Sequence, residues 1–112
     1  MNIDASAMDQ AAEQACELLK SLANRHRLLI LCRLADGERS VGDLAGFVGV
    51  RDSTASQHLS LLRRDGLVTT RREGQTILYA LASGPAREVL MALYRCYCTG
   101  EAGRAAGAGE GR

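Results

Sequence analysis

Four cysteines are the most reactive side chains of this sequence: Cys16, Cys32, Cys96 and Cys98. Thiolates act as nucleophiles, bind soft metals and metalloids, and are readily oxidised. The first residues include several acids and no apolar segment, so we expect no signal peptide and a cytoplasmic protein with reduced thiols. The cysteines are therefore expected to be packing residues, ligands or redox sensors rather than a disulfide scaffold.

A second group of polar side chains has the chemistry of DNA readout. Residues 51–72 contain five arginines and two aspartates, although the net charge of the whole chain is only +1. Arginine binds phosphate and guanine, glutamine pairs with adenine, and hydroxyls reach base edges or phosphates. The candidate DNA-binding residues are Arg51, Ser53, Thr54, Ser56, Gln57, His58, Arg71, Arg72 and Gln75.

Apolar periodicity and turn residues predict the elements that position these side chains. Helices are expected at about 9–22, 25–35, 41–48, 54–65 and 85–97, and strands at 67–72 and 75–81. The expected caps and turns are Asn24, Ser40, Gly49, either Asp52 or Ser53, and Glu73-Gly74. A length of 112 residues with 46% hydrophobic residues suits one modest core.

This order of elements predicts a mainly α fold with a β-hairpin, an α+β winged helix-turn-helix. In that arrangement the second helix of the pair enters the major groove, and the hairpin, or wing, contacts the DNA backbone or minor groove. The domain is expected to span residues 9–98, between a flexible N-terminus at 1–8 and a tail at 99–112. The tail is rich in Gly and Ala, and we expect it to be disordered.

Four segments resemble, in order, the signature blocks of the ArsR family of repressors. They are 22–28 (LANRHRL), 53–63 (STASQHLSLLR), 66–68 (GLV) and 72–76 (REGQT), within a similarity that covers roughly 18–97. The resemblance implies a homodimer with a helical interface built from the first and last helices. It also implies a pseudo-palindromic operator that the repressor leaves when an inducer binds.

The family resemblance separates the candidate DNA contacts. By position, Ser56 and Gln57 face the DNA, whereas His58 is equally suited to a hydrogen bond inside the domain. Arg71 and Arg72 on the wing are expected to contact phosphates without reading sequence. The alternative for these two arginines is a solvated strand edge whose charges discourage aggregation.

The inducer is suggested by the ligands that the sequence has and lacks. The helix at 41–48 has no Cys-x-Cys pair and the last helix has no histidine, so neither metal site common in the family is expected. Cys32, together with the segment 93–98 (LYRCYC), instead resembles the dithiol ArsR subgroup that senses persulfides or oxidants. This resemblance implies a di- or polysulfide bridge between Cys32 and Cys98.

The third thiol, Cys96, departs from the two-thiol pattern. Residues two apart on a helix point about 200° from each other, so Cys96 and Cys98 do not both face Cys32 on a regular helix. Cys96 lies on the apolar side of the last helix and is expected to pack there. Cys16, on the apolar side of the first helix, is expected to be inert.

Several alternatives stay open. Cys32, Cys96 and Cys98 are suitable soft ligands for trivalent arsenic or antimony. All four thiols could instead be inert and buried in a constitutive DNA-binding module, or the chain could be a helical domain without a DNA-binding role. A thiol oxidoreductase would need motifs that are absent here, so we expect neither enzymatic activity nor a cofactor. The expected partners are operator double-stranded DNA, a second copy of the chain and a small sulfur or oxidant inducer, with no membrane segment.

Overall fold

The computed structural model describes residues 2–99, which contain five helices and a three-stranded sheet. The helices are α1 (Ala5–Leu22), α2 (Arg25–Leu34), α3 (Val41–Val48), α4 (Asp52–Arg64) and α5 (Gly84–Cys98). The strands are β1 (Arg39–Ser40), β2 (Val68–Glu73) and β3 (Thr76–Leu81). The predicted winged helix-turn-helix is confirmed. Of the tail predicted to be disordered, residues 100–112 lie outside the described residues.

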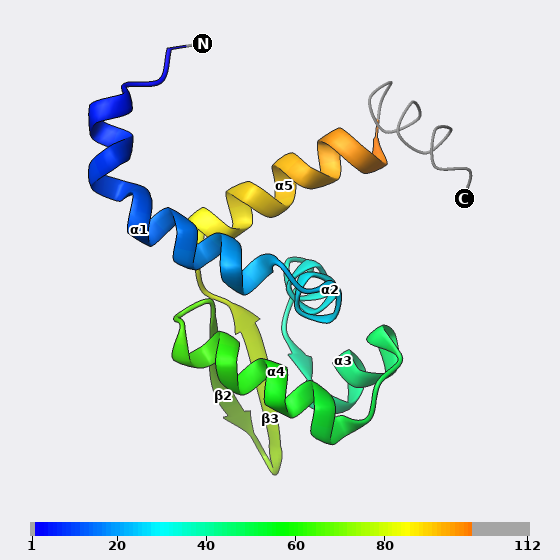
Figure 1. Cartoon of the computed structure of the whole chain (residues 1–112). Coiled ribbons are helices and arrows are strands. Elements are labelled where there is room, and N and C mark those ends of the chain that lie inside the picture. The colour runs from blue at the N-terminus through cyan, green and yellow to red at the C-terminus, as the bar shows by residue number, and fades with distance from the viewer. Residues whose placement is uncertain (1, 100–112) are drawn as a thin grey trace.

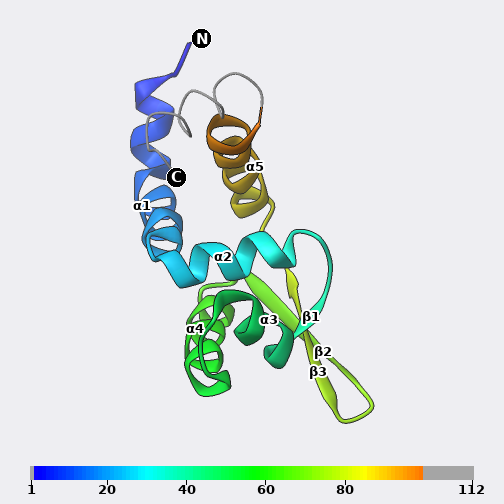
Figure 2. The same ribbon diagram turned by 90° about the vertical axis from the view of Figure 1, so that its right-hand side faces the viewer.

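Helix α2 forms the middle layer of the molecule. Helices α1 and α5 lie on one side of it, and α3, α4 and the sheet lie on the other (Figures 1 and 2). Its residues Ile30, Leu31 and Leu34 are buried in one cluster with Leu44 of α3 and Leu59 of α4. Burial of each large apolar side chain stabilises the fold by about 1.5–3 kcal/mol. The packing of α2 against α3 and α4 therefore determines the position of the helix-turn-helix.

Local capping explains where the helices of the DNA-binding half begin. The Ser40 hydroxyl accepts a hydrogen bond from the Asp43 N–H at 3.2 Å, and Gly49 ends α3 in the left-handed conformation, with φ of 84°. Both features were predicted. The predicted cap of α4 is wrong: Arg51 occupies the cap position without a side-chain hydrogen bond, and Asp52 is already the first helical residue. At this position the negative carboxylate of Asp52 interacts favourably with the positive end of the helix dipole.

The sheet contains one strand more than the sequence predicted. Its order is β1-β3-β2 and all pairs are antiparallel, with Arg39 opposite Tyr79 and Ser40 opposite Leu78. A two-residue strand is too short to show an alternation of apolar and polar residues. Strand β1 is therefore recognised only by its pairing with β3. At the other end Glu73 pairs with Thr76, which leaves a two-residue turn at the tip of the wing.

Helix α1 begins at Ala5 rather than near Asp9. The Asp4 carboxylate caps it by accepting hydrogen bonds from Ser6 N–H at 3.0 Å and Ala7 N–H at 3.3 Å. Residues 5–8, which were expected to belong to a flexible N-terminus, are therefore the first turn of this helix. In the part of the chain that the structure describes, no helix has the length and apolar character needed to span a bilayer.

Candidate DNA interface and thiol site

Helix α4 separates a buried apolar face from an exposed polar face. Ala55, Leu59 and Leu62 are completely buried, as predicted. The exposed residues of its opposite face and of the preceding turn are Arg51, Ser53, Ser56, Gln57 and Ser60, and Thr54 is half-buried beside them. This face offers the hydroxyl, amide and guanidinium groups that read base edges and bind phosphates.

His58 points toward the interior of the domain. Its ring meets His26 of α2 edge to face, with 5.6 Å between the ring centroids, and its Nδ1 is buried without a hydrogen-bond partner among residues 2–99. Burial lowers the pKa of His58, and the charges of Arg27 and His26 lower it further. The sequence allowed His58 either to face DNA or to lie inside the domain, and this packing favours the second alternative. The hydrogen bond expected for His58 inside the domain is not formed by its Nδ1 within residues 2–99.

The wing carries an arginine that is already paired. Arg71 Nε and Nη2 donate to the two carboxylate oxygens of Glu38 at 2.7 and 2.8 Å, and Glu73 lies 3.7 Å away. This pairing raises the pKa of Arg71 and lowers the pKa of Glu38. Arg72 and Gln75 are exposed, and within residues 2–99 no carboxylate lies at ion-pair distance from Arg72. Arg71 therefore reaches a phosphate only by leaving Glu38, a partner that sequence reasoning missed because it is 33 residues away.

The positive surface is smaller than the sequence suggested. Besides Arg71, Arg64 is also paired, because its Nε donates to Asp65 at 3.0 Å. Among residues 2–99, Arg51, Arg63 and Arg72 have no carboxylate within ion-pair distance. These three arginines are the cations that the region 51–72 offers to DNA without breaking an internal ion pair.

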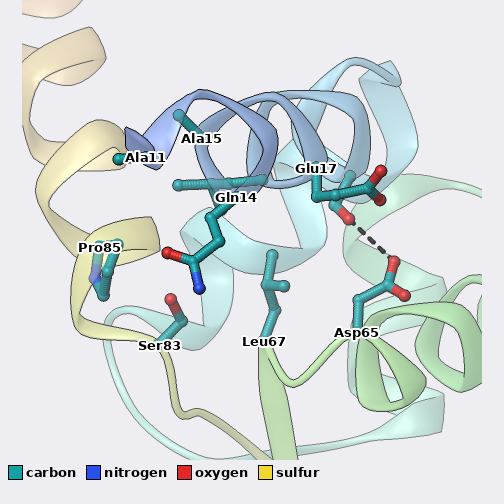
Figure 3. Close-up of a pocket in the computed structure, with 10 residues that line it drawn as sticks. Ala11, Gln14, Ala15, Glu17, Asp65, Leu67, Ser83 and Pro85 are labelled. Carbon is teal, nitrogen blue, oxygen red and sulfur yellow. Dashed lines mark hydrogen bonds between the residues drawn. The ribbon is translucent and has the colours of Figure 1, made fainter. Parts of the chain in front are cut away.

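A hydrogen bond connects α1 to the end of α4. The buried hydroxyl of Ser21 donates to Asp65 Oδ2 at 2.9 Å, and Arg27 Nε donates to the Ser21 carbonyl at 2.8 Å. Hydrogen bonds from Arg64 and then Ser21 lower the pKa of Asp65. Figure 3 shows this bond beside a hollow of about 670 Å³ between α1, the start of β2 and the start of α5. The bond joins residues 44 apart in the sequence and was not predicted.

All four cysteines are free thiols on the surface of the chain. Within a single chain, therefore, none of the four thiols is buried, and Cys16 and Cys96 do not pack against the rest of the chain as expected. The reason is visible in Figure 1, where α1 and α5 diverge from each other, so neither helix covers the whole length of the other. The apolar sides of both helices therefore stay partly uncovered within one chain.

Cys32 near the end of α2 and Cys98 at the end of α5 interact electrostatically. Partial burial raises the pKa of the Cys32 thiol, and negative charge at Cys98 and then at Asp36 raises the pKa further, whereas Cys96 makes no such contribution. Residues 2–99 contain no group of three or more His, Cys, Asp or Glu side chains arranged to hold a metal ion. The three thiols proposed as soft ligands are thus not gathered within this chain.

Cys32 also lines a groove of about 540 Å³, which we call the α2–α5 groove. Its walls come from the end of α2, from one residue of α3 and from α5. The lining residues are Cys32, Arg33, Ala35, Asp36, Phe47, Leu90, Met91 and Tyr94. A thiol, a helix-turn-helix residue and the last helix therefore share one surface hollow, which could not be predicted from the sequence.

Comparison with known proteins agrees with this geometry. Residues 24–70 match the family described as bacterial regulatory protein, arsR family. The transcriptional activator HlyU of Vibrio cholerae is 47% identical over 91 residues, which cover 81% of this chain and 84% of HlyU. The crystal structure of the transcriptional repressor BigR from Xylella fastidiosa superposes with a TM-score of 0.82 at 37% identity, covering 88% of this chain and 100% of BigR.

A solution structure adds information on assembly in a relative. The homodimeric winged helix-turn-helix DNA-binding domain of Mb0332 from Mycobacterium bovis, a possible ArsR-family transcriptional regulator, superposes with a TM-score of 0.67 at 36% identity. The match covers 82% of this chain and 83% of that domain.

Proposed function

Since this chain belongs to the ArsR family of DNA-binding transcriptional regulators, we propose that it is a homodimeric repressor released from its operator when sulfur bridges Cys32 and Cys98. The observation that carries the proposal is that Cys32 and Cys98 are both free, exposed thiols located near or at the ends of α2 and α5. Charge on Cys98, at the end of α5, raises the pKa of Cys32, at the end of α2.

The exposed face of α4 reads the operator and the wing contacts the backbone. Ser56 and Gln57 are exposed on the reading face, and Gln57 can form two hydrogen bonds with an adenine. Arg51 and Arg72 have no carboxylate partner among residues 2–99 and bind phosphates on either side of that contact. His58 is not needed as a reader, because its ring packs against His26.

Dimerisation through α1 and α5 accounts for the apolar surface that one chain leaves uncovered. Met8, Leu19 and Tyr97 on these helices are 49%, 54% and 59% exposed. Large exposed apolar side chains on neighbouring helices favour a protein interface, and the Mb0332 domain is homodimeric. A two-fold dimer presents its reading helices about 34 Å apart, so its operator is an imperfect palindrome.

The chemistry of bridging balances without an added oxidant when the inducer is a persulfide, RSSH. The Cys32 thiolate attacks the outer sulfur, which gives Cys32–S–SH and releases RSH. The Cys98 thiolate then attacks the Cys32 sulfur and expels HS⁻, which leaves a disulfide. If Cys98 has also become a persulfide, the same displacement leaves a trisulfide. The sulfane sulfur is reduced to sulfide while the two protein thiols are oxidised.

Bridging acts on DNA binding through the packing of α2. A disulfide fixes its Cβ atoms about 3.5–4.5 Å apart, so it ties the end of α5 to the end of α2. Helix α2 in turn packs against α3 and α4, and α5 belongs to the dimer surface. The bridge therefore favours a dimer in which the two α4 helices no longer match the spacing of the major groove.

The test uses the full-length reduced protein and an operator selected from a random duplex library. Wild type is expected to bind tightly and to release DNA on persulfide treatment, with a bridged product in the intact mass. Cys32→Ser and Cys98→Ser are expected to bind and to stay bound. Cys16→Ser and Cys96→Ser serve as matched controls and are expected to respond like wild type.

Three outcomes overturn the proposal. Release that persists in both Cys32→Ser and Cys98→Ser excludes a bridge as the trigger. Loss of release in Cys96→Ser, with release retained in Cys98→Ser, identifies Cys96 as the bridging thiol. Release by arsenite alone, without covalent sulfur transfer, replaces the persulfide with a metalloid as the inducer.

A further inference from the structure

The α2–α5 groove has the dimensions and the composition of a small-molecule site. Its volume of about 540 Å³ lies within the range of about 300–1,000 Å³ that ligand pockets occupy. Phe47, Leu90, Met91 and Tyr94 give it apolar walls, and the Cys32 thiol lies on the same surface. An organic molecule bound here therefore packs its carbon atoms against these walls beside a nucleophile.

Arg33 gives the groove a positive group that the described part of the chain leaves unsatisfied. Its guanidinium carbon lies 5.1 Å from the centroid of the Phe47 ring, which holds the side chain over the groove. Its Nε is buried without a hydrogen-bond partner, and within residues 2–99 no carboxylate lies at ion-pair distance from it. Buried polar groups are nearly always hydrogen-bonded, so the unpartnered Nε of Arg33 is an unusual feature.

Asp36 limits how much negative charge the groove accepts. It lines the same hollow, and its charge is felt at the Cys32 thiol. A ligand with several negative charges is repelled by the Asp36 carboxylate. A ligand with one carboxylate avoids this repulsion, because Arg33 binds its only negative charge. The groove thus favours a ligand that has a single carboxylate and an apolar body.

We infer that the α2–α5 groove is the inducer-binding site, and that it selects small organic persulfides carrying one carboxylate, which Arg33 binds while the outer sulfur reaches Cys32. This inference rests on the proposed thiol-based function and adds the ligand class and its recognition residue. Arg33 is a specificity residue: it holds the carboxylate by charge-assisted hydrogen bonds and takes no part in the sulfur transfer. The reaction at Cys32 is the first displacement described above, in which RSSH leaves one sulfur on the protein and departs as RSH.

The experiment measures sulfur transfer directly and needs no DNA. In the full-length Cys16→Ser/Cys96→Ser/Cys98→Ser protein Cys32 is the single remaining thiol and the reaction stops at Cys32–S–SH, which intact mass and peptide mapping detect as one added sulfur. The probes are the persulfides of 3-mercaptopropionate, which has a carboxylate, and of 2-mercaptoethanol, which is neutral and similar in length. The carboxylate probe is expected to react about tenfold faster, a ratio typical of one charge-assisted hydrogen bond.

Arg33→Gln is the test variant and Arg25→Gln is its matched control. Arg25 is exposed at the other end of α2 and does not line the groove, so its loss changes the net charge of the protein equally. In Arg33→Gln the ratio of the two rate constants is expected to fall to about one, and in Arg25→Gln it is expected to stay near tenfold. Circular dichroism checks that the helices of both variants are intact.

Equal rates for the two probes in the parent protein overturn the inference, as does a ratio that Arg33→Gln leaves unchanged. The latter result is also expected if a second copy of the chain fills the groove. Both outcomes leave the proposed function standing when persulfide still releases wild type from DNA. A protein that transfers sulfur selectively at Cys32 but stays bound to its operator contradicts the proposed function instead, because sulfur then has no effect on DNA binding.

Discussion

Replacing Glu38 by glutamine is expected to strengthen binding to random DNA by releasing Arg71. The carboxylate now accepts two hydrogen bonds from the guanidinium, at 2.7 and 2.8 Å, and its lowered pKa keeps it ionised at neutral pH. Phosphate oxygens compete for the same donors, so the internal carboxylate acts as a substitute for the phosphate. Glutamine at position 38 removes the charge and lets Arg71 pair with DNA.

The size of the effect follows from the number of phosphates contacted. Each additional phosphate neutralised on B-DNA steepens the plot of log K against log salt by about 0.9. Glu38→Gln is therefore expected to steepen the slope by about 0.9 per wing, and binding to random duplexes at low salt should tighten. Binding to the operator should gain no more than binding to random DNA, because a phosphate contact has no sequence information.

Fluorescence anisotropy at several salt concentrations measures both slopes. Glu13→Gln is the matched control, since it removes the same charge from the exposed side of α1, far along the chain from the wing. The double variant Glu38→Gln/Arg71→Gln should return to a slope no steeper than that of wild type. An unchanged slope in Glu38→Gln, or a steeper slope that survives in the double variant, refutes the reasoning.

Three further predictions concern α4 and its neighbours. Gln57→Ala should weaken operator binding by about 1–3 kcal/mol without affecting random DNA, whereas Arg72→Ala should weaken both equally and flatten the salt slope; equal losses in anisotropy for Gln57→Ala would exclude it as a reader. Ser21→Ala should lower the free energy of unfolding in urea by about 1 kcal/mol and raise the pKa of Asp65 in an NMR titration, and an unshifted carboxyl would contradict the hydrogen bond. Because burial lowers the pKa of His58, the unfolded chain binds a proton first, so stability should fall as the pH drops below about 6.5, and His58→Gln should reduce that fall in urea titrations.

The positions of the helices and the wing follow from short-range information in the sequence. Leu59 and Leu62 recur at helical spacing and are buried. Ser40 and Gly49 delimit α3, as the capping hydroxyl of serine and the backbone freedom of glycine predict. Helix periodicity, caps and hairpin turns each involve residues only a few positions apart. The winged helix-turn-helix and the exposed polar face of α4 were therefore predictable before any tertiary contact was known.

The chemical state of individual side chains depended on contacts between distant segments. The sequence placed Arg71 on the wing as a phosphate ligand, but only the fold brings Glu38, 33 residues away, into contact with it. The sequence placed His58 among the polar residues of α4 that could contact DNA. The packing of α4 on α2 instead turns its ring toward His26.

The thiols illustrate the same division. The positions of Cys32, Cys96 and Cys98 near helix ends could be read from the sequence, but the exposure of Cys16 and the groove beside Cys32 could not. Helical spacing tells which side of a helix is apolar, and it does not tell whether another helix covers that side. The angle between α1 and α5 decides this, because it is set by the packing of side chains that lie far apart in the chain.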